Sequence, residues 1–448
     1  MTEAGRPRPN IVFVFADQMR ASAMGCMGNG QVRTPQIDAL AAEGTLLTNA
    51  ISGHPLCSPY RAMLLTGRYC QSTGLVSNDI PLPDHKDTLA RAFKRHGYHT
   101  GYIGKWHLEA RRSPYVTRER HQGFDYWVSE NCDHDYFDTP VCFNGDPELK
   151  TLKGYQPNAQ TDLAIDYINA HKDAPFLLCM SWGPPHNPYV APEDYMKLYD
   201  PSDIKQRPNV QGDHTEDIAH HYAQITNLDH NIGRLIRAIE DAGIRDDTVF
   251  VFTSDHGDML GSQGRAGKQL PWEESIHVPF VLRYPRVAQA GVIRGVMLNT
   301  VDIMPTLLSL AGLPIPTSVE GRDLSPSLLG EPAEEPDSVL LQAILPCHGS
   351  FGQTDAWRGV RTKRYTYARF RDKNWVLYDN EADPYQLNNL IDKPEARQLQ
   401  KQLEDELQAW LERTNDDFAS REEWKHRVEA ATGLPGIRFD EFRAEWYT

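Results

Sequence analysis

Cys57 lies in an unusual sequence setting, Cys-Ser-Pro-Tyr-Arg-Ala-Met-Leu-Leu-Thr-Gly over positions 57–67. Pro59 suits the first turn of a helix, because the N–H group that proline lacks would have no partner there. The apolar residues that follow would continue this helix until Gly67 ends it. Cys57 is therefore predicted at a helix N-terminus, where unpaired N–H groups favour an anion such as sulfate or phosphate. A single cysteine is otherwise most often a small buried apolar residue.

Two polar clusters each follow a predicted buried strand. Asp17 and Gln18 come directly after the apolar run 11–16, and Asp255 and His256 follow the run 249–253. Carboxylates together with an amide oxygen suit a hard cation such as Ca²⁺ or Mg²⁺. An Asp in this position can equally cap a helix. The longer run Ser-Asp-His-Gly-Asp-Met-Leu-Gly from position 254 favours the metal site, because it is far more specific than an isolated Asp.

Cationic and imidazole side chains form a third group of candidates. Lys105 and His107 are two residues apart, so an extended backbone would direct both side chains to one side. His186 lies in a proline-rich loop after another apolar run, and His is the natural general acid near neutral pH. Lys268 follows a glycine-containing stretch that would let it reach over a bound anion. Taken singly, these residues are equally compatible with a solvated lysine, a plain turn or a flexible surface loop.

Strands and helices alternate along most of the chain, which predicts an α/β fold with a largely parallel central sheet. Short apolar runs indicate the strands, and capping residues with closing glycines indicate the helices. The predicted strands are 11–16, 98–104, 176–182, 249–253 and 279–284. The predicted helices are 35–43, 87–96, 216–242 and 302–311. Ligands of such sheets gather beyond the carboxyl ends of the strands, where Asp17 and Asp255 both lie.

The sequence changes character after a proline- and acid-rich segment at 330–337. Antiparallel strands are predicted beyond it, followed by an amphipathic helix over 394–413 with leucines at four-residue steps. The predicted strands are 339–345, 359–369 and 375–378. We therefore expect a catalytic domain over 1–335 and a small α+β domain over 336–448.

The composition of the chain restricts the kinds of molecule that it can bind. The chain has 448 residues and a formal net charge of −15, which argues against nucleic acid or an anionic membrane surface as a partner. No segment has the apolar length of a membrane span, and residues 1–10 lack the apolar core of a secretory signal. The seven cysteines are irregularly spaced, which favours reduced thiols. A cytoplasmic location is expected.

Ten residues together resemble the type I sulfatases, members of the alkaline-phosphatase-like superfamily, in their order and approximate spacing. They are Asp17, Gln18, Cys57, Arg61, Lys105, His107, His186, Asp255, His256 and Lys268. The run Leu-Tyr-Asp-Asn-Glu-Ala-Asp-Pro over 377–384 also resembles the ending of that family. The resemblance covers residues 10 to about 390 and implies a large, mostly parallel sheet flanked by helices, with a smaller α+β C-terminal domain.

The resemblance also implies a mechanism for the hydrolysis of a sulfate monoester, expected to be that of a sulfated carbohydrate. A formylglycine-generating enzyme would convert Cys57 to 3-oxoalanine (formylglycine), whose hydrate attacks sulfur. One divalent cation, Ca²⁺ in preference to Mg²⁺ or Mn²⁺, would be held by Cys57 with the polar pairs at 17–18 and 255–256. His186 would protonate the departing alcohol, and His107 would regenerate the aldehyde. The cations at positions 61, 105 and 268 would hold the sulfate and the nucleophile.

Two departures from the family pattern leave alternatives open. Gln18 stands where many members have a second Asp, and His256 where they have an Asn. This combination also resembles the phosphonate monoester hydrolases, which would use the same formylglycine on a phosphonate monoester or phosphodiester. That branch is expected to lack the pair Lys105 and His107. A third possibility is a non-catalytic sulfoglycan-binding protein with a relic site.

Loop residues are weaker candidates for holding the leaving group. They are Asn78, Asn131, His134, Asp135, Trp182 and His348. Of these, Asn78, Trp182 and His348 are the predicted substrate contacts. The aromatic tail 424–448 would cover a neighbouring subunit of a homo-oligomer or, more simply, pack on its own domain.

Overall fold

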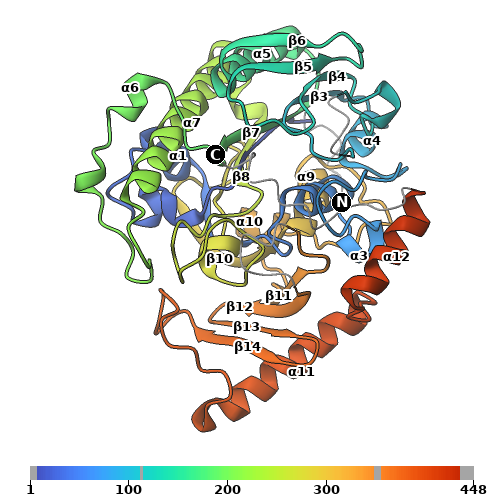
Figure 1. The fold of residues 1–448 in the computed structure, drawn as a ribbon. Helices are drawn as coiled ribbons and strands as arrows, with labels where there is room; N and C mark the ends of the chain where they lie inside the picture. Colours follow the sequence, from blue (N-terminus) through green and yellow to red (C-terminus); the bar gives the residue numbers. More distant parts are fainter. Residues whose placement is uncertain (1–7, 111–114, 348–354, 434–448) are drawn as a thin grey trace.

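The large central sheet of the computed structural model positions the candidate residues. The structure describes residues 8–110, 115–347 and 355–433, and within them ten strands form one sheet in the order β10-β2-β9-β8-β1-β7-β3-β4-β5-β6 (Figure 1). The strands are β1 (Asn10–Asp17), β2 (Thr45–Ile51), β3 (His99–Gly104), β4 (Tyr126–Ser129), β5 (Phe137–Phe143), β6 (Lys150–Tyr155), β7 (Phe176–Pro185), β8 (Thr248–Ser254), β9 (Phe280–Arg283) and β10 (Val292–Asn299). The run from β8 through β1, β7 and β3 to β4 is parallel, while β9, β5 and β6 pair antiparallel. The predicted mixed, mostly parallel sheet is confirmed.

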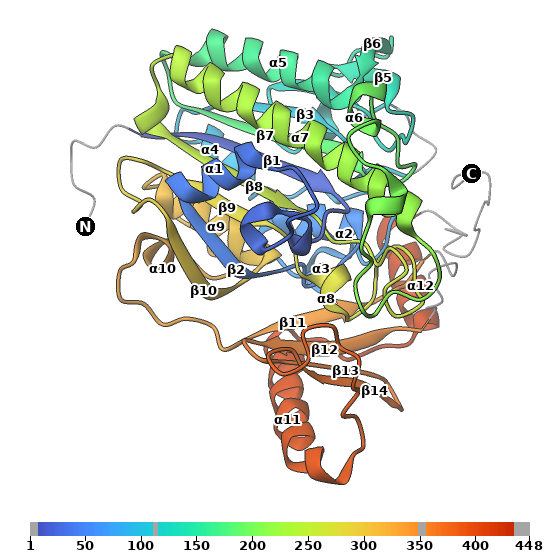
Figure 2. The same cartoon turned by 90° about the vertical axis from the view of Figure 1, so that its left-hand side faces the viewer.

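Helices cover both faces of this sheet (Figure 2). One face packs against α1 (Pro35–Glu43), α5 (Gln156–His171) and α7 (Thr215–Asp241), and the other against α2 (Cys57–Thr66), α4 (Leu89–Lys94) and α9 (Thr300–Leu310). Alternate residues of β1 explain this layering, since Phe13 and Phe15 enter one core and Val12 and Val14 the other. A strand buried on both faces reads as the continuous apolar run seen at 11–16.

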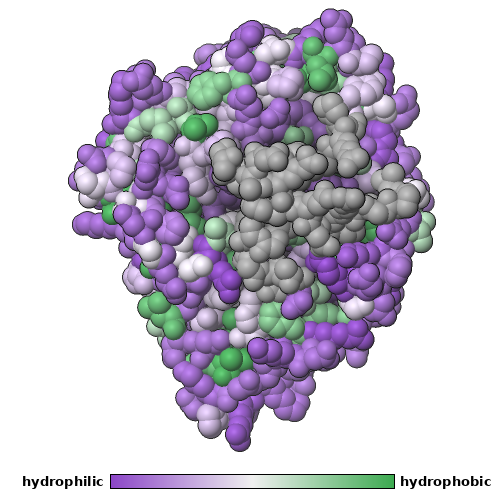
Figure 3. Space-filling view, viewed as in Figure 1, coloured by the Kyte–Doolittle hydropathy of each residue, from purple (hydrophilic) through white to green (hydrophobic). Residues whose placement is uncertain are grey.

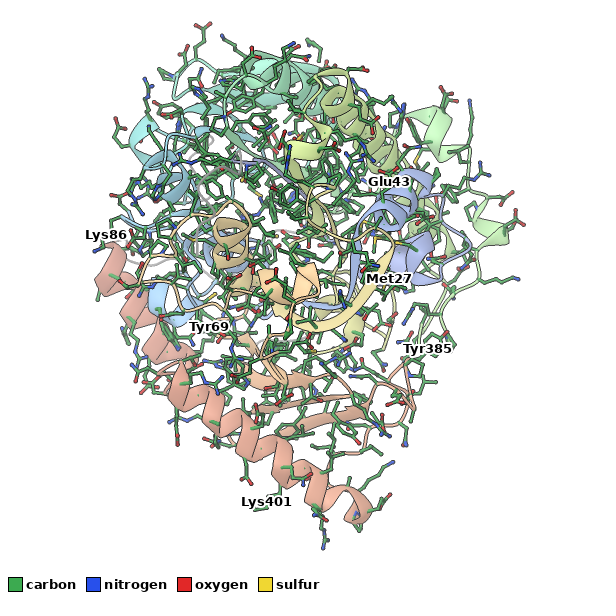
Figure 4. The ribbon with its side chains drawn as sticks, turned by 180° about the vertical axis from the view of Figure 1, so that it is seen from behind. Met27, Glu43, Tyr69, Lys86, Tyr385 and Lys401 are labelled. Atoms are coloured by element: carbon green, nitrogen blue, oxygen red, sulfur yellow. The ribbon has the colours of Figure 1, made fainter. Side chains whose placement is uncertain are left out.

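A second sheet lies below the first and is antiparallel (Figures 1 and 2). Its strands, in order, are β11 (Ser338–Ala343), β12 (Trp357–Thr362), β13 (Tyr365–Phe370) and β14 (Asn374–Asp379). Helix α11 (Arg397–Arg413) packs on it through Leu403, Leu407 and Leu411, which are buried. Lys401 lies on the outer side of this helix (Figure 4). The expected α+β character of this region is confirmed, and its boundary near residue 336 stays a prediction.

The remaining helices are short, except the last. They are α3 (Cys70–Thr73), α6 (Glu193–Met196), α8 (Glu273–Ile276), α10 (Ser325–Leu329) and α12 (Arg421–Thr432). Trp424 and Val428 of α12 are buried in the main core, so this part of the tail packs on its own chain. Within the described residues, no helix has the length and apolar character needed to cross a membrane. Outside the grey residues, Figure 3 shows a mainly hydrophilic face with small, separate apolar groups.

Several predicted boundaries were wrong. The predicted strand 359–369 is a hairpin of β12 and β13, because the chain turns at Lys363 and Arg364 between them. The predicted helix 87–96 is only α4, which begins after Thr88, whose side chain accepts a hydrogen bond from the Arg91 N–H. No element was predicted over 126–171, where β4, β5, β6 and α5 lie. The β-strands there are short or partly exposed and carry no continuous apolar run.

Candidate active site

The candidate residues gather at the carboxyl ends of neighbouring parallel strands. Ala16 of β1 pairs with Ser254 of β8 and with Trp182 of β7, so all three strands end at one edge. Asp17 is the last residue of β1, and Asp255 directly follows β8. Parallel strands place their ligand sites at this edge. The fold therefore brings together side chains that are more than two hundred residues apart in the chain.

Cys57 is the first residue of α2, as its proline pattern predicted, and Gly67 ends the helix with a φ of 62°. The start of the helix is tied down by two hydrogen bonds. The Ser58 N–H donates to Asn78 Oδ1 at 3.0 Å, and the Ser58 hydroxyl donates to the His107 carbonyl at 2.6 Å. Asn78 thus holds the start of α2 in place. The Cys57 side chain is buried.

Four potential metal ligands converge. The ligand atoms of Asp17, Cys57, Asp255 and His256 all lie within 4.8 Å of one another, and all four residues are buried. His256 Nε2 lies 3.3 Å from Cys57 Sγ and 3.5 Å from an oxygen of each carboxylate. Its Nδ1–H donates to the Gly257 carbonyl at 3.0 Å, so Nε2 carries the lone pair that a metal needs.

The electrostatics of the two carboxyl groups also fit a cation. Burial and the neighbouring Asp17 together raise the pKa of Asp255 to about 6. Burial acts on Asp17 in the same direction, but Lys105 and the other nearby cations outweigh it and hold the Asp17 pKa well below its usual value. A divalent cation between the two groups would favour the ionised form of both. The residues present therefore suit a hard metal ion.

Gln18 is held in one orientation by charged neighbours. Its Nε2 donates to Asp258 Oδ2 at 2.7 Å, and its Oε1 accepts from Lys268 Nζ at 2.7 Å. A carboxylate only accepts and an ammonium only donates, so these two contacts determine which way the amide points. The Tyr189 hydroxyl also donates to Asp258 Oδ2, at 2.6 Å. The sequence analysis gave Asp258 and Tyr189 no role, although Asp258 belongs to the run that begins at position 254.

Arg61 lies behind the carboxylates. Its Nη2 is 3.2 Å from Asp17 Oδ2 and 3.3 Å from Asp255 Oδ2. Its Nη1 donates to the Ser181 hydroxyl at 2.6 Å and to the Lys105 carbonyl at 2.5 Å. Although burial alone would lower the Arg61 pKa, neighbouring Tyr102 and the two carboxylates raise it overall. Arg61 therefore remains charged and orients Asp17 and Asp255.

Lys105 and Lys268 bring two further cations to the site. Lys105 Nζ lies 2.7 Å from Asp17 Oδ2, and its side chain is completely buried. Burial lowers the Lys105 pKa, but Asp17, Cys132 and Cys57 together outweigh burial and raise the pKa overall. The backbone from 105 to 107 is not a simple extension of the strand, because β3 ends at Gly104 and His107 has a φ of 53°. Lys105 and His107 nevertheless both reach the site.

The two candidate proton-transfer residues have opposite environments. His107 Nε2 lies 3.8 Å from Asp79 Oδ1. Burial lowers the His107 pKa, but Cys132 and Asp79 outweigh it and raise the pKa well above its usual value. At His186, burial and Lys268 together hold the pKa well below its usual value. The His186 Nδ1–H donates to the Asn187 carbonyl at 2.6 Å, which leaves Nε2 for a substrate.

The predicted substrate contacts have different positions. Asn78 is only 4% exposed and binds the start of α2, and Trp182 is fully buried in the core between β7 and the helices. His348 lies outside the described residues. Direct contact of these side chains with a substrate stays a prediction. In a sequence, a polar residue that holds a helix end or an aromatic residue of the core looks the same as a residue of a binding loop.

Comparison with known proteins identifies the family. The family model described as Sulfatase matches residues 9–313. The chain belongs to the sulfatase family. It is therefore a sulfuric ester hydrolase of the alkaline-phosphatase-like superfamily. A second model, described as N-sulphoglucosamine sulphohydrolase, C-terminal, matches residues 261–413 of this sulfatase.

Individual relatives agree with this assignment. An ulvan-active sulfatase from Formosa agariphila is 41% identical over 97% of this chain and 88% of its own length. The solved structure of a Bacteroides fragilis protein assigned to the sulfatases, YidJ, has a TM-score of 0.85 at 33% identity and covers 93% of this chain and 98% of its own. The phosphonate monoester hydrolase of Agrobacterium radiobacter has a TM-score of 0.76 over 92% of this chain and 97% of its own, but its 24% identity shows the fold alone.

Proposed function

We propose that this sulfatase hydrolyses the sulfate monoester of a carbohydrate to an alcohol and inorganic sulfate, using formylglycine made from Cys57. The observation that carries the proposal is the convergence of Cys57 with two carboxylates and His256 within 4.8 Å, beside the buried cations Lys105 and Lys268. Two similarities support a saccharide: a relative named for activity on ulvan and a family model named for a sulphoglucosamine hydrolase.

Two groups complete the site in this proposal. Conversion of Cys57 by a formylglycine-generating enzyme would place the two hydroxyl groups of an aldehyde hydrate near the position of Sγ. Asp17, Gln18, Asp255 and His256 would hold one divalent cation. Their hard oxygen donors suit Ca²⁺, Mg²⁺ and Mn²⁺, and the resemblance to the type I sulfatases favours Ca²⁺ among these. When bound, the cation supplies a Lewis acid that polarises a sulfate oxygen and lowers the pKa of the attacking hydroxyl.

The lysines bind the sulfate. Lys105 and Lys268 flank the Cys57 side of the site, and buried cations at such positions stabilise the negative charge that develops on the sulfate oxygens. Arg61 acts on the carboxylates and keeps them in place. The chain has a net charge of −15, so these local cations must attract the anionic substrate against the overall charge.

The two histidines move the protons. His186 is neutral in its buried, cationic surroundings, and the charge of an arriving sulfate offsets those cations and favours its protonation. Protonated His186 then donates to the oxygen of the departing alcohol. His107 must be neutral to act as a base, and conversion of Cys57 removes one of the groups that raise its pKa. It then accepts a proton from the second hydroxyl, and the Asp79 carboxylate stabilises the imidazolium that results. Sulfate is then expelled.

The alternative functions use the same residues differently. The pair Gln18 and His256 is also expected of a phosphonate monoester hydrolase, but Lys105 and His107, which that branch is expected to lack, both lie in the site. The presence of two candidate proton-transfer histidines and two buried lysines argues against a relic site that only binds sulfoglycans.

The test begins with mass spectrometry of the peptide that contains Cys57, in protein produced with a formylglycine-generating enzyme. We expect formylglycine in place of cysteine, hydrolysis of defined sulfated saccharides, and loss of activity on chelation that added Ca²⁺ restores. An intact thiol in fully active protein would contradict the proposed nucleophile. Faster turnover of phosphonate monoesters than of matched sulfate monoesters would favour the alternative enzyme.

A further inference from the structure

His134 lies between two groups of the candidate active site. It belongs to the segment that joins β4 to β5, and its side chain is half-buried. Its ring stacks on the His186 ring, with centroids 4.3 Å apart and an angle of 8° between the planes. Its Nε2 lies 3.5 Å from Lys105 Nζ. His134 therefore contacts both a proposed sulfate-binding cation and the proposed proton donor to the leaving group.

The contact with Lys105 determines which nitrogen of His134 carries the proton. An ammonium group only donates, so Nε2 must accept and Nδ1 must carry the hydrogen of the neutral ring. Lys105 itself remains charged because it is paired with Asp17 at 2.7 Å. Among the described residues, no group accepts a hydrogen bond from His134 Nδ1. The Nδ1–H is thus a donor beside the active site.

The stacking places the His134 ring against the proposed proton donor to the leaving group. In the proposed mechanism, His186 protonates the oxygen through which the sulfate is attached to the alcohol. A ring that stacks on His186 at 4.3 Å is within reach of substituents on the carbon atoms next to that oxygen, if the substrate binds as the mechanism requires. A saccharide sulfated on a secondary ring hydroxyl such as O3 carries a hydroxyl on a neighbouring ring carbon, whereas a simple aryl sulfate carries none.

We propose that His134 is a specificity-determining residue that donates a hydrogen bond from Nδ1 to a saccharide hydroxyl next to the sulfated carbon. This inference rests on the proposed function, and it adds a leaving-group contact to the sulfate-binding residues. The ligand is the hydroxyl-bearing ring of the substrate and not its sulfate group. A buried or half-buried donor of this kind discriminates strongly against analogues that lack the hydroxyl.

The variant His134→Ala tests the assignment with two substrates. We expect kcat/KM for a sulfated monosaccharide to fall by about tenfold to a hundredfold, as for loss of one specific hydrogen bond in a site. We expect kcat/KM for 4-nitrophenyl sulfate to change by less than about threefold, because this substrate has no hydroxyl partner. His134→Gln, whose amide can accept from Lys105 and still donate, should recover part of the saccharide activity. His230→Ala is the matched control, since His230 binds the Tyr195 hydroxyl on α6.

A binding measurement separates this inference from the proposed function. Calorimetric titration with the desulfated monosaccharide should give a weaker affinity for His134→Ala than for the wild type, and titration with inorganic sulfate should give equal affinities. Equal losses on both substrates would overturn the inference, because His134 would then act through Lys105 on the sulfate. Unchanged kinetics on both would overturn it as well. A wild type that cleaves aryl sulfate but no sulfated saccharide would instead refute the carbohydrate substrate and, with it, the role of His134.

Discussion

Buried charges occupy two regions of this sulfatase, and they are arranged in opposite ways. In the C-terminal region, Arg358 and Asp416 form a bidentate pair at 2.5 and 3.1 Å, with both side chains fully buried. Each charge there has one partner. In the active site, Arg61 and Lys105 share Asp17, and Arg61 also contacts Asp255.

The comparison distinguishes structural charges from functional ones. The bidentate pair satisfies both charges, and further hydrogen bonds of Arg358 to backbone carbonyls and of Asp416 to a backbone N–H leave little to bind a ligand. Shared contacts leave ammonium hydrogens and carboxylate lone pairs that a sulfate or a cation can complete. Buried charges that lack one-to-one partners are costly to the fold, and such groups are found mainly where a ligand binds. This pattern points to the region around Cys57 as the active site.

The largest expected effect is that of Cys57→Ala. Removal of the nucleophile should lower kcat by about 10⁵-fold or more, because no other group can replace it. Thermal unfolding should change little. The matched control is Cys70→Ala, another buried cysteine, which should keep its activity in steady-state assays. Comparable losses in both variants would mean that the effect is one of folding.

Breaking the one-to-one pair should act on stability alone. Arg358→Ala leaves Asp416 buried without its partner, and we expect the free energy of unfolding to fall by about 3–5 kcal/mol. Urea denaturation measures this loss. The kcat of the folded protein should stay within about twofold of the wild type, because the pair touches no active-site residue. A large loss of kcat would contradict the division between the two regions.

Removing a cation of the active site should lower activity and have little effect on stability. Lys268→Ala takes away a donor from the sulfate site, and we expect kcat/KM to fall by about 10²- to 10³-fold, as for one oxyanion-stabilising donor. The midpoint of thermal unfolding should fall less than in Arg358→Ala, since removal of Lys268 leaves the neutral Gln18 amide oxygen, and not a buried charge, without its donor. Arg358→Ala is expected to lose stability and keep activity, and Lys268→Ala to lose activity and keep stability. A Lys268→Ala variant that is destabilised but has normal kinetics would contradict this division.

Asp258→Asn should loosen the orientation of Gln18. The new amide can face Gln18 with either its oxygen or its nitrogen, so Lys268 alone then directs the Gln18 oxygen. We expect about 10- to 100-fold weaker binding of Ca²⁺, which is typical for partners that orient metal ligands. Metal titration followed by calorimetry gives the affinity directly, without reference to turnover. An unchanged affinity would show that Gln18 Oε1 serves Lys268 and not the metal.

The smallest expected effect is on the pH dependence of stability, through the ion pair of Glu273 and Arg361. Burial raises the Glu273 pKa, but Arg361, at 2.7 Å, outweighs it and lowers the pKa well below the usual value. A depressed carboxyl pKa stabilises the fold above the unfolded value of about 4.3, and this stability is lost as the pH falls further. Glu273→Gln should therefore be less stable than the wild type at pH 7, and the difference should narrow below about pH 4. Urea denaturation at both pH values checks this prediction.

Local sequence patterns predicted much of the fold and less of the site. The strands at 11–16 and 249–253 were evident because both faces are buried, and the helix from Cys57 was evident from Pro59 and Gly67. The hairpin of β12 and β13 was read as one strand, since its turn of lysine and arginine contains no glycine or proline. Asn78 was predicted at the substrate, yet its contact with Ser58 is a long-range hydrogen bond that no periodicity reveals.

The sequence alone determined which chemistry this protein can perform, because the order of Cys57, the acidic pairs, the lysines and the histidines matches the sulfatase pattern. Only the tertiary structure decided which neighbours each of these residues contacts. It placed Arg61 behind the carboxylates, held the Gln18 amide through Asp258, and stacked His134 on His186. The physical reason is that hydrogen bonds and charge pairs depend on distances of a few ångströms between strands and loops that are far apart in the chain.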